Sequence, residues 1–146
     1  MILVNGTRYC TGSLINTTAN DNRPLLLTAH HCLGGPGNNY IQYDAINNPA
    51  LNHWSFYWHY EAPKCGNVSI EPPHLSTIGA TVIANNEASD FALLRLAEDP
   101  RNKRGVTPYY LGWDYTERIR AGGVCIHHPN GDVKKISTYT MTPKSE

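Results

Sequence analysis

Residues 27–32 (LTAHHC) place two histidines and a cysteine directly after an apolar run. An imidazole can act as a general base or as a metal ligand near neutral pH, and a cysteine can bind a metal or form a disulfide bond. The cluster alone is equally compatible with a metal half-site and with surface histidines beside a structural disulfide. Cys10 heads another strand-like segment upstream, and a bridge between Cys10 and Cys32 would limit how far His31 can move.

Asp90 stands at the start of a second apolar segment, residues 90–96 (DFALLRL). A carboxylate in that place is desolvated on its protein side and then needs a partner such as an imidazole. The alternative is that Asp90 only caps a turn. The segment by itself does not decide between these two roles.

The elements that would position these residues are short strands. Helical periodicity is scarce, and Gly, Pro, Asn and Asp interrupt the sequence roughly every eight to twelve residues. This pattern predicts an all-β fold, either a sandwich or a barrel. Residues 54–60 (WSFYWHY) are rich in aromatic side chains and are expected to anchor the core. The predicted strands are residues 8–15, 25–29, 40–43, 54–60, 76–84, 91–96, 123–127 and 133–140.

Five segments together resemble the trypsin-like serine peptidases, and most closely their bacterial lysyl endopeptidase branch. They are residues 10–14 (CTGSL), 27–32 (LTAHHC), 89–94 (SDFALL), 112–114 (GWD) and 126–130 (IHHPN). The resemblance implies that His31, immediately before the cysteine, is the general base of a Ser-His-Asp triad and that Asp90 orients it. It also implies a Cys10–Cys32 disulfide. His30 stands where most trypsin-like enzymes have a small residue, which favours the lysyl endopeptidase branch.

The same resemblance implies a chymotrypsin-like antiparallel β-barrel. We expect a six-stranded first barrel, complete or nearly so, over residues 1–104, and it should carry His31 and Asp90. Residues 98–105 are rich in charged residues and turn formers, so they are the expected connection. Residues 105–146 are then this connection and the first strands of a truncated second barrel, and the chain is expected to be the N-terminal part of the peptidase only.

The nucleophile is the missing part of the expected triad. In this family the serine follows the aspartate, and Ser137 and Ser145 are the serines that follow Asp90. Neither lies in the Gly-Asp-Ser-Gly context that exposes the hydroxyl and builds the oxyanion hole. We therefore expect a partial serine endopeptidase that does not hydrolyse peptides alone, and whose full-length form acts on a protein or peptide substrate.

Two alternatives remain open. One is a non-catalytic, protease-like binding module in which His31 and Asp90 are relics. The other is a metal-binding domain built from five residues: His30, His31, Cys32, His127 and His128. Adjacent side chains on a strand point to opposite faces, which argues against two neighbouring histidines binding the same ion. The triad interpretation predicts no metal and no cofactor.

Composition bounds the partners and the compartment. Twelve Lys+Arg balance twelve Asp+Glu, so no global charge draws the chain to nucleic acid or to anionic lipid. The longest apolar run is far too short to cross a bilayer. The cysteines form no CxxC pair, which favours structural disulfides and a secreted or extracytoplasmic protein.

We also expect disulfide partners for Cys65 and Cys125, and an exposed apolar surface near the end of the chain. The resemblance pairs Cys65 with a cysteine upstream of this chain and Cys125 with one in the second barrel, while a direct Cys65–Cys125 bridge is left open by the sequence. Apolar surface over residues 106–146 is expected to be exposed, and to drive self-association of the fragment.

Overall fold

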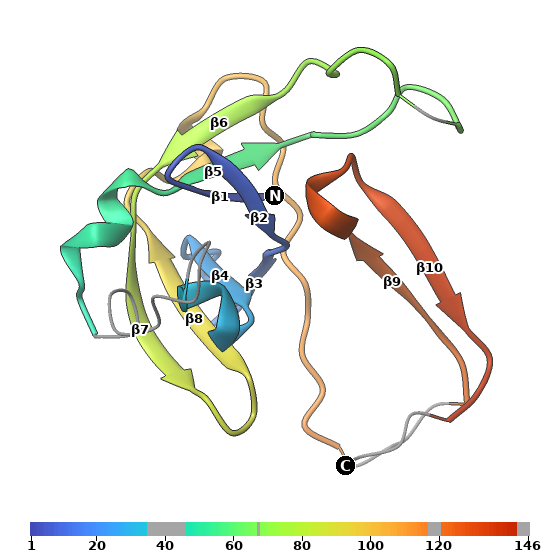
Figure 1. Ribbon diagram of the computed structural model, residues 1–146. Helices are drawn as coiled ribbons and strands as arrows, with labels where there is room; N and C mark the ends of the chain where they lie inside the picture. Colours follow the sequence, from blue (N-terminus) through green and yellow to red (C-terminus); the bar gives the residue numbers. More distant parts are fainter. Residues whose placement is uncertain (35–45, 67, 117–120, 143–146) are drawn as a thin grey trace.

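The computed structural model describes residues 1–34, 46–66, 68–116 and 121–142, and its fold is all-β. Two four-stranded sheets and one two-stranded sheet are antiparallel throughout, and the helical segments among the described residues are short 3₁₀ turns (Figure 1). The predicted fold class is therefore confirmed. No helix in these residues has the length and apolar character needed to cross a membrane.

The first sheet has the strand order β2–β1–β5–β6. Its opening hairpin turns at Asn5 and Gly6, which both have positive φ, as an Asn-Gly turn between two strands requires. β1 was not predicted, because the first strand expected from the sequence begins at residue 8. The strands are β1 (Ile2–Val4), β2 (Thr7–Cys10), β5 (Ser55–Trp58) and β6 (Leu75–Ile78).

The second sheet has the order β3–β4–β8–β7. In β8 the residues Ala92, Leu94 and Leu96 are buried and alternate with more exposed ones, the period of a strand with one face on the core. The bounds of β8 agree with the prediction. The strands are β3 (Ser13–Ile15), β4 (Leu25–Thr28), β7 (Ala80–Asn86) and β8 (Phe91–Leu96).

The chain passes between the two sheets three times, and two of these passages are corners at which one strand continues into the next. β2 continues into β3 through Thr11 and Gly12, and β6 continues into β7 through Gly79, whose φ is +87°. Strands that bend from one sheet into the next form such corners in orthogonally packed sheets. Counting each bent pair once reduces the eight strands of the two sheets to six, five of which match predicted strands, while β1 takes the place of the strand expected at 40–43. Among the described residues, however, hydrogen bonding does not close them into one barrel, because the strand pairs form two separate sheets.

The main core lies between the two sheets. Its largest fully buried side chains come from both sheets, from the 3₁₀ turn η1 (His30–Gly34) and from the turn η3 (Pro49–His53). Trp54 and Phe56, in the aromatic segment expected to anchor the core, are 0% and 1% exposed. The others include Ile2, Val4, Leu33, Leu51, Val82 and Leu94.

A separate hairpin, β9 (Gly123–His127) and β10 (Lys135–Tyr139), projects beside the two sheets in Figure 1. The segment that leads to it is tied to the second sheet. The amide of Asn16 donates to the carbonyl of Leu111 at 3.1 Å, and the amide of Leu111 donates to the carbonyl of Leu14 at 2.9 Å. The predicted domain boundary between residues 104 and 105 remains a prediction, and the predicted strand at 40–43 lies outside the described residues.

A substitution at the β2–β3 corner tests this packing. A Cβ at Gly12 would lie 2.4 Å from Cδ2 of Leu26 and 3.1 Å from Cδ1 of Ile2, and both side chains are buried. We expect Gly12→Ala to lower the free energy of unfolding by about 1–3 kcal/mol through overpacking. Gly112→Ala is the control, since its Cβ would meet nothing within 4 Å. Equal denaturant midpoints for the two variants would refute the role of this corner.

Candidate active site

The register of one strand pair brings the predicted catalytic residues together. β4 ends at Thr28, which pairs with Ala92 of β8. In an antiparallel pair, residues just after one strand lie beside residues just before the other. His31 therefore meets Asp90 although the two are 59 positions apart in the sequence.

The β7–β8 turn sets the backbone at Asp90. Its amide donates to the carbonyl of Glu87 at 3.1 Å, and its φ is +47°. The Oδ1 atom of Asn86 accepts from the amide of Ser89 at 2.9 Å and closes the same turn. Aspartate tolerates the left-handed region better than most side chains do. The turn can thus present a carboxylate beside the end of β4 without needing glycine.

Both carboxylate oxygens of Asp90 accept hydrogen bonds from His31. The backbone amide of His31 donates to Oδ1 at 2.9 Å, and ring Nδ1 lies 2.8 Å from Oδ2. These bonds, the backbone one first, hold the pKa of Asp90 below its ordinary value. The side chains of His31 and Asp90 are 59% and 52% exposed, so solvent reaches this pair.

An ionised carboxylate can only accept hydrogen bonds, so a neutral His31 ring must carry its hydrogen on Nδ1. Nε2 then keeps its lone pair and can take a proton from a nearby hydroxyl. This is the geometry of a general base with its orienting acid.

A disulfide bond holds the base of this pair. Cys10 at the end of β2 is bonded to Cys32 in η1, with their Cα atoms 6.2 Å apart. The amide of Cys32 donates to the carbonyl of Ala29 at 3.2 Å and closes the turn that follows β4. His31 thus lies between a strand end and a cross-link to the first sheet.

His30 and His31 occupy different environments although they are neighbours. His30 is 8% exposed, and its Nδ1 has no hydrogen-bond partner among the described residues. A 3₁₀ turn directs successive side chains to different sides. In η1 this turns His30 into the protein and leaves His31 beside Asp90.

The other residues singled out in the sequence lie elsewhere. Ser137 on β10 has its Oγ 3.0 Å from Nε2 of His127 on β9. Cys65 and Cys125 are exposed and belong to no disulfide among the described residues. Ser145 lies outside those residues.

The described residues contain one group compact enough for a metal ion. It consists of Cys10, His31 and Cys32, whose ligand atoms lie within 4.8 Å of one another. The alternative set inferred from the sequence also included His30, His127 at the end of β9 and His128 just after it, and these are not part of the group. The alternative metal site is therefore not assembled as proposed.

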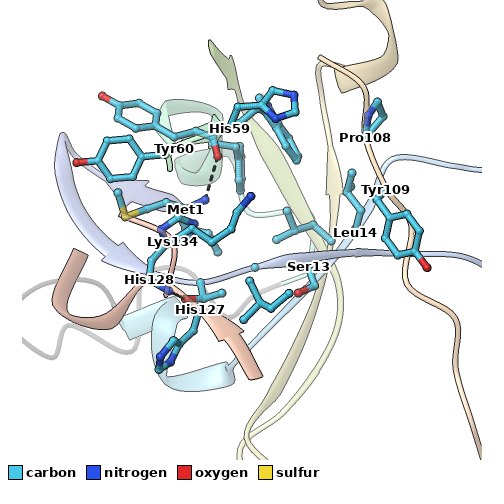
Figure 2. Close-up of a pocket in the computed structure, with 18 of the residues that line it drawn as sticks. Met1, Ser13, Leu14, His59, Tyr60, Pro108, Tyr109, His127, His128 and Lys134 are labelled. Carbon is cyan, nitrogen blue, oxygen red and sulfur yellow. Dashed lines mark hydrogen bonds between the residues drawn. The ribbon is translucent and has the colours of Figure 1, made fainter. Parts of the chain in front are cut away.

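A cavity of about 420 Å³ lies between the first sheet, the segment after residue 105 and the end of β9. In Figure 2 Pro108 and Tyr109 lie on one side of it, and His127 and His128 on another. Neither His31 nor Asp90 lines it. This cavity was not predicted from the sequence, because its walls come from segments far apart in the chain. Of these segments, only the aromatic residues at 54–60 stood out in the sequence.

Thr11 joins the candidate site to the hairpin. Its carbonyl accepts from Oγ1 of Thr28 at 2.8 Å, and its own Oγ1 accepts from the amide of His128 at 2.9 Å. The ring Nδ1 of His128 lies 3.0 Å from the carbonyl of Asp132. Burial is the main cause that lowers the pKa of His128 to about 4.

Sequence comparison places the chain in a known family. The family described as "Lysyl endopeptidase, C-terminal domain" matches residues 1–146. The chain belongs to this family. A lysyl endopeptidase of Pseudomonas aeruginosa is 30% identical over 136 residues, which cover 90% of this chain and 26% of the relative. The chain thus spans about a quarter of that relative's length. The resemblance to the lysyl endopeptidase branch is confirmed, while the placement of the chain at the start of the peptidase remains a prediction.

The tautomer of the His31 ring tests whether the Asp90 carboxylate keeps the ring hydrogen on Nδ1. In Asp90→Asn the amide nitrogen can donate to ring Nδ1 while Oδ1 still accepts from the backbone, so we expect the ring proton to move to Nε2. Nitrogen-15 NMR of the His31 ring reports this exchange directly. Asp114→Asn is the control, because Asp114 accepts from Thr116 in an exposed turn. An unchanged tautomer in Asp90→Asn would contradict the assignment.

The partly buried ring of His128 predicts a pH dependence of stability. A histidine in the unfolded chain has a pKa of about 6.5, whereas that of His128 in the fold is lowered to about 4. Above pH 6.5 the ring is neutral in both states; below it the unfolded chain binds the proton more readily. The free energy of unfolding should therefore fall between about pH 6.5 and pH 4. His128→Gln should flatten this slope in urea titrations, and exposed His53→Gln should leave it in place.

Proposed function

We propose that this chain supplies the general base, His31, and the orienting carboxylate, Asp90, of a secreted serine endopeptidase. The observation that carries the proposal is the double contact of Asp90 with the amide and ring of His31. Membership of a lysyl endopeptidase family supports the same chemistry.

In this mechanism Nε2 of His31 takes the proton of a serine hydroxyl as its oxygen attacks the peptide carbonyl. The imidazolium then gives that proton to the leaving amine, and a water molecule repeats the sequence to release the acyl group. Asp90 keeps the ring in the required tautomer and stabilises the imidazolium through the Nδ1 hydrogen bond.

The serine in this proposal lies outside residues 1–146. Ser137 supports this, since its hydroxyl contacts His127 rather than the His31–Asp90 pair. The half-exposed side chains of His31 and Asp90 also favour a further part of the protein that covers that side of the site. We therefore infer that the isolated chain is inactive, and that the remaining part of the protein brings the nucleophile and the oxyanion donors.

The surface of the hairpin fits the same inference. Several large apolar side chains are exposed on β9, on β10 and on the segment before them, and an apolar surface of this kind is expected to be covered. In the isolated chain it would drive self-association. These side chains are Tyr109, Trp113, Tyr115, Val124, Ile126 and Ile136.

The substrate is proposed from the matched relative, and the compartment from the Cys10–Cys32 disulfide. The matched relative is named a lysyl endopeptidase, and we propose that the complete protein cleaves after lysine in peptide chains. The Cys10–Cys32 disulfide favours an oxidising, extracytoplasmic compartment.

Activity of the complete protein tests the proposal. In the full gene product that contains this chain, His31→Ala should lower kcat/KM for a lysyl peptide amide by about 10,000-fold or more. Residues 1–146 alone should release no product above buffer. The exposed His53→Ala is the matched histidine control and should retain normal activity.

Two results would overturn this function. One is full activity of His31→Ala in the complete protein. The other is hydrolysis by the isolated chain at the rate of the complete protein, which would require a nucleophile within residues 1–146.

A further inference from the structure

The disulfide beside His31 has the composition of a soft-metal site in its reduced form. The two sulfur atoms and a ring nitrogen of His31 lie within 4.8 Å of one another. Two thiolates and one imidazole are a ligand set that zinc prefers over harder oxygen ligands. The oxidised pair offers no thiolate, so this property appears only when the bond is broken.

The backbone already holds the two cysteines at a suitable separation. Their Cα atoms are 6.2 Å apart, and each Zn–S bond would add about 2.3 Å to the reach of a side chain. Cys10 lies at the end of β2 and Cys32 in η1, so two separate elements fix the ligands. Little backbone movement is needed for both side chains to rotate toward one ion.

His31 can reach the same ion as its neighbour Cys32 because a ring nitrogen of His31 already lies within 4.8 Å of both sulfur atoms. Successive side chains of a 3₁₀ turn are about 120° apart at three residues per turn, so the two residues approach the ion from different directions. Cys32 is 2% exposed and the His31 side chain is 59% exposed. The site would thus have a buried sulfur side and a solvent side.

We propose that reduced Cys10 and Cys32, together with His31, bind Zn²⁺. A dithiol reductant breaks the S–S bond and is itself oxidised to a disulfide, while each cysteine sulfur gains a proton. Zinc displaces both thiol protons to solvent, and a ring nitrogen donates its lone pair. Water takes the fourth position on the exposed side. The disulfide and the zinc site are mutually exclusive states of the same cysteines.

Asp90 supports zinc binding through Nε2 of the His31 ring. If Nε2 binds the ion, Nδ1 keeps its hydrogen bond to Asp90, which is the carboxylate–histidine–zinc arrangement that orients metal ligands. If Nδ1 binds, the ion replaces that hydrogen bond. In both cases the imidazole is occupied, so a zinc-bound chain has no free general base. This last consequence rests on the proposed function, whereas the metal site itself does not.

Zinc binding is tested in a Cys65→Ser, Cys125→Ser background, which removes the two exposed thiols. After reduction with a phosphine, this chain should retain stoichiometric zinc through gel filtration, and after oxidation it should retain none. His31→Ala should weaken zinc binding at least about tenfold in a chelator competition, and His53→Ala should not change it. With cobalt in place of zinc, sulfur-to-metal charge-transfer absorption should appear and should be lost in Cys32→Ser.

The fold of the reduced chain is followed in the same samples by circular dichroism and thermal unfolding. Zinc should raise the Tm of the reduced chain and leave that of the oxidised chain unchanged; if reduction alone unfolds the chain, zinc should restore the fold. The proposal is overturned by equal zinc in both redox states, by no zinc in the reduced state, or by a His31→Ala affinity equal to that of the parent. Activity of the complete, oxidised protein is a separate readout, so either idea can fail without the other.

Discussion

The candidate site depends on the register between β4 and β8. Thr28 pairs with Ala92, and this pairing alone decides which residues beyond the strand ends come into contact. A slip by one residue would turn the inward face of β8 outward, exposing Leu94 and burying its neighbours. Because the register is specified by core packing, the same apolar side chains that stabilise the fold also place Asp90 beside His31. Stability and site geometry therefore cannot be separated in this protein.

The sequence predicted the parts of this arrangement that local patterns encode. The apolar segments of β8 and β4 were sufficient to place both strands. The break within residues 8–15 was not predicted, because it arises from the close approach of Gly12 to Leu26 across the two sheets. β1 is a three-residue strand without alternating polarity, and it becomes a strand only through its pairing with β2 and β5. The local sequence pattern does not show which distant segments will pair, so a strand that depends on such pairing is not predicted from it.

The local sequence also does not show which of the adjacent residues His30 and His31 is the candidate general base. Nothing in the local sequence separates His30 from His31, and the resemblance to a family supplied the choice. In the structure the separation is a matter of burial and direction: His30 turns inward, and His31 stands at the open end of the strand pair. The 3₁₀ geometry of η1 is therefore what gives two identical side chains different surroundings.

At the corner between β2 and β3, the adjacent residues Cys10 and Thr11 make one covalent bond and two hydrogen bonds to other parts of the fold. Cys10 is cross-linked to the turn that carries His31, Thr11 receives a hydrogen bond from the end of β4, and the hydroxyl of Thr11 receives one from the β9–β10 hairpin. A shift of the hairpin would therefore pull on the backbone that also holds β4. Since the bonds run through the backbone and a short side chain, this connection is stiff rather than adaptable. The hairpin is thus linked to the backbone beside the His31 turn through Thr11, without contacting His31 itself.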